Sequence, residues 1–213
     1  ALQLATAAGA ERIVVNTWHL GGLMEAAVAA ATETGVKVGL SRESSLMGTA
    51  GGLALARDRG LLGTSGPVVV INGDGLLRLD LGPLFERHRT RRDAVTLGLL
   101  PHPDPTRWSR VVVDPEGTVT AIRPPGDVAP GEISSVYPGV MVVSREALDG
   151  LPPSPGETPD RLWFPALAAG NLGGALIPGR WREVGTAADY LAVVSEQLAG
   201  ENFIHPTATV SPT

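Results

Sequence analysis

The first half of the chain alternates short apolar, β-branched segments with longer segments of helical composition, and this alternation constrains the fold more than any other feature. Strand-like segments cover residues 12–16, 36–40, 67–71 and 94–100, and helix-like segments cover residues 1–9, 23–34, 51–59 and 81–92. Continuous apolar strands separated by helices are typical of a sheet that helices cover on both faces. The sequence therefore predicts a doubly wound, Rossmann-like α/β body.

The second half of the chain follows a different pattern, because a hairpin interrupts the alternation. Because a hairpin adds antiparallel strands, the predicted sheet is mixed. Thr186 and Asp189 form a variant of the capping box and predict the start of a last helix. The expected elements are a hairpin of residues 110–114 and 118–122, a strand over 136–143, and helices over 161–169 and 187–198.

Composition excludes several classes of function. Lysine and arginine total 17 against 22 aspartates and glutamates, and the net charge of −5 disfavours a nucleic-acid partner. The chain has no cysteine and its four histidines are dispersed, so a metal would be held by oxygen ligands. No apolar stretch approaches the roughly 20 residues that span a bilayer, and the sequence does not open with the basic region of a signal peptide. We therefore expect a cytoplasmic protein without a membrane partner.

The two ends of the sequence differ from its body. Residues 1–9 have no capping side chain before them. Near the other end, Ile204 and Val210 stand six residues apart with mostly small residues between them, a spacing that predicts the start of a parallel β-helix. We assign residues 1–200 to one domain and residues 201–213 to the start of the β-helix.

Two acidic residues are candidates for a metal site. Asp74 comes after Asn72 and Gly73, beyond the end of an apolar strand, where open α/β sheets bind ligands. Asp74 suits a divalent metal, and an Asp-Gly turn chosen only for its backbone angles explains it equally well. Glu183 lies on a short predicted strand before the last helix. Considered alone, Glu183 is expected to be a surface carboxylate.

A loop of small residues opens the predicted helix over 51–59. Its residues Gly48, Thr49, Ala50, Gly51 and Gly52 would let a flat ring or a phosphate approach the main chain, where the free N–H groups of a helix start are donors. The alternative is structural, with Thr49 as the N-cap and the glycines allowing close helix packing. Taken alone, a Gly-rich helix start is more often structural.

Three segments stand out when they are taken together: Gly48-Thr49-Ala50-Gly51-Gly52, the strand end Asn72-Gly73-Asp74, and Trp181-x-Glu183-Val184-Gly185-Thr186. In their order and approximate spacing they resemble the sugar-1-phosphate nucleotidyltransferases, in particular the branch of the mannose-1-phosphate guanylyltransferases and glucose-1-phosphate thymidylyltransferases. The resemblance also covers residues 13–16, Arg107-Trp108-Ser109, Pro138-Gly139-Val140 and the six-residue period after residue 200.

The resemblance implies transfer of a nucleotidyl group from a nucleoside triphosphate to a sugar 1-phosphate, with release of pyrophosphate and with Mg²⁺ as cofactor. By this resemblance Asp74 and Glu183 are the catalytic residues, and both hold the metal on the α-phosphate. The implied nucleotide-binding residues are Gly48, Thr49, Ala50, Gly51, Gly52, Asn72 and Gly73, and the implied sugar-binding residues are Gly139 and Arg123.

The sequence departs from the family pattern in three respects. The pattern implies a strand and a Gly-rich, Arg-containing loop before Ala1, and we expect that segment to be missing from the sequence. Lys37 is the only lysine and lies on a predicted strand, so neither lysine of the family pattern is supplied; Arg123 stands near one of those places but differs from lysine in reach and geometry. Glu183 replaces an aspartate and is one methylene longer.

Two functional hypotheses follow. Asp74, Glu183 and the Gly-rich loop favour an enzyme, and the missing lysines favour a catalytically silent relative that binds a nucleotide-sugar and regulates a partner. We favour the enzyme. Its expected partners are a nucleoside triphosphate and a sugar 1-phosphate, together with further copies of the chain, since extended β-helices commonly stack chains.

Overall fold

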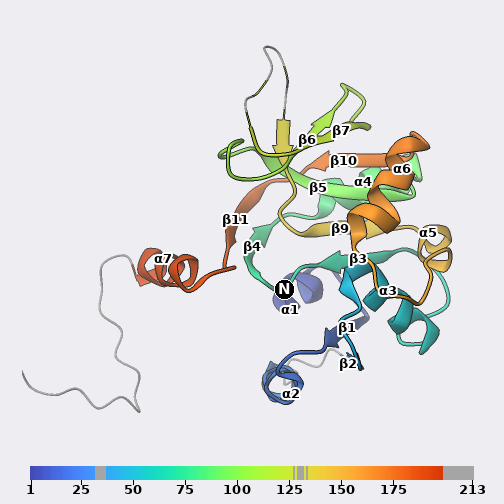
Figure 1. The fold of residues 1–213 in the computed structure, drawn as a ribbon, viewed down its shortest axis with the longest axis vertical. Coiled ribbons are helices and arrows are strands. Elements are labelled where there is room, and N and C mark those ends of the chain that lie inside the picture. The colour runs from blue at the N-terminus through green and yellow to red at the C-terminus, as the bar shows by residue number, and fades with distance from the viewer. Residues whose placement is uncertain (32–36, 127, 129–131, 133, 199–213) are drawn as a thin grey trace, which may run out of the picture.

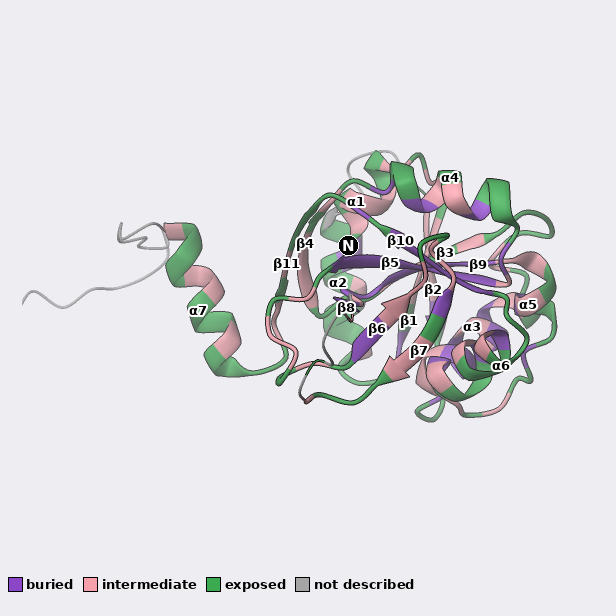
Figure 2. Cartoon of the chain, turned by 90° about the horizontal axis from the view of Figure 1, so that it is seen from above, coloured by how far each residue is buried: buried purple, intermediate pink, exposed green. Residues whose placement is uncertain are grey.

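The body of the protein is a mixed sheet with helices on both faces (Figures 1 and 2). The structure is a computed structural model that describes residues 1–31, 37–126, 128, 132 and 134–198. The strand order of the main sheet is β3 (Val68–Ile71), β9 (Val140–Val143), β5 (Val95–Pro101), β8 (Ser134–Val136), β6 (Arg110–Val113) and β7 (Val119–Arg123), and β10 (Leu172–Leu176) pairs with β5.

Two further strand pairs stand apart from the main sheet. The strands β1 (Arg12–Thr17) and β2 (Lys37–Arg42) pair in parallel. The strands β4 (Gly75–Leu79) and β11 (Gly179–Glu183) pair in antiparallel orientation. The helices are α1 (Leu2–Ala7), α2 (Gly21–Ala31), α3 (Gly48–Asp58), α4 (Gly82–Arg91), α5 (Arg145–Asp149), α6 (Phe164–Ala168) and α7 (Ala187–Leu198), and a short π-helix, Pro159–Trp163, leads into α6.

The main sheet has a separate hydrophobic core on each face. Met141 and Val143 of β9 belong to the core that α3, α5 and α6 cover, whereas Val140 and Val142 belong to the core on the side of α4. The alternation arises because successive side chains of a strand point to opposite faces of a sheet. All four side chains are almost completely buried. The doubly wound α/β fold predicted from the sequence is therefore confirmed.

The prediction of one continuous strand over residues 136–143 is wrong, because the structure has two strands there. Tyr137, Pro138 and Gly139 separate β8 from β9. Proline lacks the N–H that a central strand needs, and Gly139 adopts a φ of +94°, which side chains disfavour. The β-helix predicted after residue 200 lies outside the described residues.

Strand β10 is not predicted by its sequence, because its two consecutive glycines weaken a strand pattern. Both glycines are required by the packing. A Cβ at Gly173 would overlap Oδ2 of Asp93, and a Cβ at Gly174 would lie 2.6 Å from Leu99. At these two positions β10 therefore approaches its neighbours more closely than a side chain would allow. Among the described residues, no helix is both long and apolar enough to cross a bilayer.

A buried polar network ties α4 to strand β5. His88 Nδ1 lies 2.8 Å from Thr96 Oγ1, and the Thr96 hydroxyl donates to Asp93. Arg87 pairs with the same carboxylate at 3.0 Å and donates to the carbonyl of Glu116. Burial lowers the pKa of His88, and the carboxylate of Asp93 offsets only part of that effect. His88 is therefore neutral in the folded protein at neutral pH.

The lowered pKa predicts a pH-dependent stability. Between the folded pKa and the unfolded value of about 6.5, the unfolded chain binds more protons, so the free energy of unfolding decreases as the pH falls through this window. Replacing His88 with asparagine should make this decrease smaller. Urea unfolding at pH 7.5, 6.5 and 5.5 measures the effect, with His19→Asn, an exposed histidine, as the control. The same pH dependence in His88→Asn and wild type would contradict the prediction.

Candidate active site

The β4–β11 pair brings together two acidic residues that are far apart in the sequence. Glu183, the last residue of β11, is the register partner of Gly75, and the next N–H, that of Val184, donates to the carbonyl of Asp74 at 3.0 Å. Asp74 and Glu183 therefore occupy adjoining main-chain positions at one end of the pair. The side chain of Asp74 is exposed and makes no hydrogen bond or ion pair with any described residue.

The carboxylate of Glu183 is held by the loop before β6. Trp108 donates its indole N–H to Glu183 Oε2 at 3.1 Å, and Arg107 donates to the same oxygen at 3.3 Å. Arg107 also pairs with Asp189 of α7 at 3.1 Å. A hydrogen bond from the Thr186 hydroxyl and one from Arg107 lower the pKa of Asp189, which keeps this side chain charged.

A cavity of about 300 Å³ lies beside this carboxylate and is bordered by Trp108, Trp181 and α7. The ring of Trp108 packs edge-on against that of Trp181 at 5.1 Å. Trp181 in turn covers Gly75, where a Cβ would lie only 3.2 Å from the indole nitrogen. The aromatic pair therefore forms a firm wall for the cavity.

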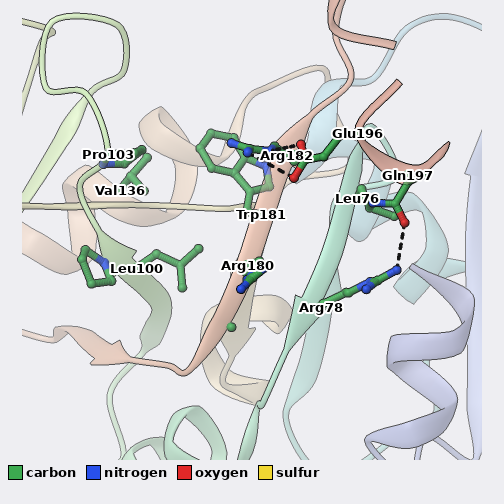
Figure 3. Close-up of a pocket in the computed structure, with 12 residues that line it drawn as sticks. Leu76, Arg78, Leu100, Pro103, Val136, Arg180, Trp181, Arg182, Glu196 and Gln197 are labelled. Carbon is green, nitrogen blue, oxygen red and sulfur yellow. Dashed lines mark hydrogen bonds and ion pairs between the residues drawn. The ribbon is translucent and has the colours of Figure 1, made fainter. Parts of the chain in front are cut away.

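Figure 3 shows a second cavity, which adjoins the first and shares Pro103, Trp181, Arg182 and Glu196 with it. Its volume is about 310 Å³. Arg78 and Arg180 are direct register partners there, and Arg182 lies two residues further along β11. Arg182 pairs with Glu196 of α7 at 2.9 Å, and Arg78 donates to Gln197 at 3.0 Å. Two of the three arginines, Arg78 and Arg182, therefore contact α7, in both cases at exposed positions.

The start of β9 lies against the end of β3. Asn72 donates its backbone N–H to the carbonyl of Gly139 at 2.8 Å, and a Cβ at Gly139 would lie 2.8 Å from the Cβ of Asn72. Tyr137 packs edge-on against Trp163 at 4.9 Å. Burial, and to a smaller extent the charge of Asp74, raise the pKa of Tyr137, so its hydroxyl is neutral. The structure thus places Asn72, Gly139 and Asp74 in one region.

The Gly-rich loop forms the first turn of α3 and is covered by another segment. Ala50 and Gly51 donate their N–H groups to the carbonyl of Gly156 at 3.1 and 3.2 Å, and the N–H of Thr49 points to the carboxylate of Glu157 at 3.4 Å. The helix begins at Gly48, so Thr49 is not its N-cap. In this structure the donors of the helix start are occupied by the chain itself.

The glycines of this loop allow close approach of polar groups. A Cβ at Gly48 would lie 2.6 Å from the Glu157 carboxylate, and one at Gly52 would lie 2.8 Å from Glu43 Oε1. The buried Glu43 carboxylate also accepts from Asn16 and from the N–H of Met47, both at 3.0 Å. The packing role proposed for the glycines is therefore present, while their contact with a nucleotide stays a prediction.

Arg123 is engaged in an ion pair rather than free. It stands directly opposite Arg110 in the β6–β7 ladder. Both guanidinium groups pair with the largely buried carboxylate of Glu132, Arg123 at 3.2 Å and Arg110 at 2.5 Å. Two like charges in register would repel each other, and the shared carboxylate offsets the repulsion. A sugar contact of Arg123 stays a prediction and would require this pair to open.

The sequence analysis missed the roles of several residues. Arg107 and Trp108 belong to the family resemblance, but nothing in the sequence indicates that they contact Glu183. Glu157 and Tyr137 carried no signal, because their contacts join elements distant in the chain. The described residues contain no group of three or more histidine, cysteine, aspartate or glutamate side chains that could hold a metal. The metal ligands Asp74 and Glu183 therefore stay a prediction.

The site lies on a fold of the nucleotidyl transferase class. The model of the family described as "Nucleotidyl transferase" matches residues 1–200, so the chain belongs to this family. It is 28% identical to the mannose-1-phosphate guanylyltransferase of Mycobacterium tuberculosis over 99% of this chain and 62% of that protein. It is 27% identical to the probable mannose-1-phosphate guanylyltransferase 1 of Oryza sativa subsp. japonica over 75% of this chain and 44% of that protein. The chain thus spans less than two thirds of these relatives.

Solved structures share the same fold. HddC from Yersinia pseudotuberculosis aligns with a TM-score of 0.74 and 17% identity over 92% of this chain and 83% of that chain, and a complex of HddC with GMP-PN aligns equally well. A putative glucose-1-phosphate thymidylyltransferase from Bacillus anthracis aligns with a TM-score of 0.73 and 19% identity over 96% of this chain and 82% of that chain. The family resemblance inferred from the sequence is confirmed.

The contact between Gly139 and Asn72 predicts a specific cost. Gly139→Ala places a side chain in a left-handed backbone conformation, which costs about 1–2 kcal/mol, and it also pushes Asn72 away from β9. Gly63→Ala is the matched control, because Gly63 has a φ of +71° but no atom within 4 Å of the position that a Cβ would take. Urea unfolding should show a larger loss of stability for Gly139→Ala than for Gly63→Ala. Equal losses would show that the contact with Asn72 is not tight.

Proposed function

We propose that this chain transfers a nucleotidyl group from a nucleoside triphosphate to a sugar 1-phosphate, and that the guanylyl group and mannose 1-phosphate are the pair it uses. The observation that carries the proposal is the pairing of β4 with β11, which sets Asp74 beside Glu183. A phosphate oxygen of the sugar 1-phosphate attacks the α-phosphorus, and the bond to the β-phosphate breaks to release pyrophosphate. The relative from Mycobacterium tuberculosis supports the choice of base and sugar.

The donor set at this position fits Mg²⁺. The ion prefers oxygen ligands and is usually bound by one or two carboxylates together with substrate phosphates and water. Asp74 is exposed, and Glu183 has one carboxylate oxygen, Oε1, without a hydrogen bond from any described residue. When bound, the metal supplies positive charge that stabilises the negative charge on the transferred phosphate.

Other residues of this region would bind and orient the substrates. Asn72, Tyr137 and Gly139 lie at the junction of β3 and β9, close to Asp74. The neutral phenol of Tyr137 can donate a hydrogen bond to a sugar hydroxyl, and the absence of a Cβ at Gly139 lets Asn72 lie close against the start of β9. We assign the sugar to this region and the nucleotide to the neighbouring turn of α3.

The alternative is a silent relative that binds a nucleotide-sugar and regulates a partner. One feature favours it, namely that Lys37 is the only lysine of the sequence, so neither lysine of the family pattern is supplied. The N–H groups at the start of α3 are bonded to Gly156 and directed to Glu157, and this holds equally for both hypotheses. A nucleotide that used these donors would have to displace the 154–157 segment. The enzyme remains our preferred hypothesis, because a binding protein does not require two acidic residues at one end of the same strand pair.

Asp74→Asn tests the proposed function. Removing one charged ligand should lower turnover on the order of a hundredfold or more, since metal charge stabilisation is worth several kcal/mol, while thermal stability stays unchanged. The measurement is pyrophosphate release from a panel of nucleoside triphosphates with mannose 1-phosphate or glucose 1-phosphate and Mg²⁺, using the intact protein. Asp149→Asn, an exposed aspartate of α5, serves as the control.

The panel also separates the two hypotheses. Turnover that is fastest with GTP and mannose 1-phosphate supports the proposed pair. No turnover with any pair, together with measurable binding of GDP-mannose, would support the silent relative. Full activity of Asp74→Asn would remove this residue from the metal site.

A further inference from the structure

The two oxygens of the Glu183 carboxylate differ in their surroundings. Both hydrogen bonds, from Trp108 Nε1 at 3.1 Å and from Arg107 at 3.3 Å, go to Oε2. Within the described part of the chain, Oε1 has no hydrogen-bond partner. One oxygen is therefore fixed by the protein, and the other is left for a ligand.

Of the two donors, Trp108 is the better fixed. The side chains of Arg107 and Glu183 are 49% and 40% exposed, and exposed ion pairs contribute little because solvent screens them. Arg107 also divides its charge between Glu183 and Asp189. Trp108, in contrast, is partly buried, packs edge-on against Trp181, and is covered by the guanidinium of Arg107 at 4.4 Å from the ring centre.

The position of Trp108 is set by a chain of contacts that ends at the main chain of β4. Trp181 lies close over Gly75, since a Cβ at Gly75 would be 3.2 Å from its indole nitrogen. Gly75 is itself the register partner of Glu183. The indole that donates the hydrogen bond and the carboxylate that accepts it are thus located by the same strand pair.

A glutamate needs such a donor more than an aspartate does. Its extra methylene adds one torsion, so an unrestrained Glu183 would distribute its carboxylate over more positions and lose more entropy on binding a cation. Hydrogen bonds from neighbouring residues orient ligating carboxylates, and their removal commonly weakens metal binding by about 10–100-fold.

We propose that Trp108 is a positioning residue, whose indole N–H holds Oε2 of Glu183 so that Oε1 is presented to the divalent cation. This proposal rests on the proposed function, because it assumes that Glu183 is a metal ligand. It assigns Trp108 a role in cation affinity in addition to its packing in the cavity wall.

Trp108→Phe removes the N–H donor and keeps an aromatic ring against Trp181. We expect the dissociation constant for Mn²⁺ alone, measured by the electron paramagnetic resonance signal of the free ion, to rise by about 10–100-fold. Trp163→Phe is the matched control, because the indole of Trp163 also donates a hydrogen bond, to the sulfur of Met141. The control should bind Mn²⁺ as the wild type does, and thermal unfolding checks that both variants are folded.

A double-mutant cycle tests the mechanism. Glu183→Asp withdraws the carboxylate from the indole, so in that background Trp108→Phe should change the Mn²⁺ dissociation constant by less than about twofold. Should Trp108→Phe not fold, Trp108→His, which keeps a ring N–H, replaces it and is expected to retain most of the affinity. Equal effects of Trp108→Phe in the wild type and in the Glu183→Asp background, or unchanged affinity in Trp108→Phe, would overturn the proposal.

Asp74→Asn in the same Mn²⁺ titration separates this inference from the proposed function. Weaker binding in Asp74→Asn but not in Trp108→Phe would retain the metal site and refute the role of Trp108. If neither Asp74→Asn nor Glu183→Gln changes the Mn²⁺ dissociation constant, the metal site itself is refuted, and with it the role of Trp108.

Discussion

The antiparallel ladder between β4 and β11 is the constraint on which the candidate site depends. It fixes Glu183 opposite Gly75 and bonds the N–H of Val184 to the carbonyl of Asp74, so the main chains of the two acidic residues share one end of the same strand pair. The hydrogen bonds of the ladder join residues that are about a hundred positions apart in the sequence, Gly75–Leu79 and Gly179–Glu183. A shift of one residue would move the side chain of Glu183 to the opposite face, away from Trp108.

The sequence predicted the fold class but not every element of it. Apolar runs such as that of β5, Val95–Pro101, carry the strand signal in their own composition, because they are buried in the sheet. Strand β10 carries no such signal, since its glycines are selected by the approach of Asp93 and Leu99. The break at Tyr137 to Gly139 is also set by tertiary contacts, in this case by the junction with Asn72.

The candidate site shows the same division. The residue types and order of Asp74 and Glu183 are visible in the sequence, whereas their proximity follows from strand pairing that no local pattern encodes. The Gly-rich loop illustrates why such motifs are ambiguous. Its glycines meet Glu43 and Glu157 at distances that would exclude a Cβ, so the same composition satisfies internal packing and close approach of a ligand.

The chain's use of arginine affects how it can bind phosphates. A guanidinium presents several donors in one plane, so a single arginine can bridge two partners, as Arg107 does between Glu183 and Asp189 and Arg87 does between Asp93 and the Glu116 carbonyl. These cations are already neutralised by carboxylates. A triphosphate that bound Arg107 would have to take the place of a carboxylate that Arg107 now contacts. If that carboxylate is Glu183, it would lose one of its two hydrogen-bond donors. Substrate charge and the orientation of Glu183 are therefore coupled through Arg107, while the hydrogen bond from Trp108 does not depend on that exchange.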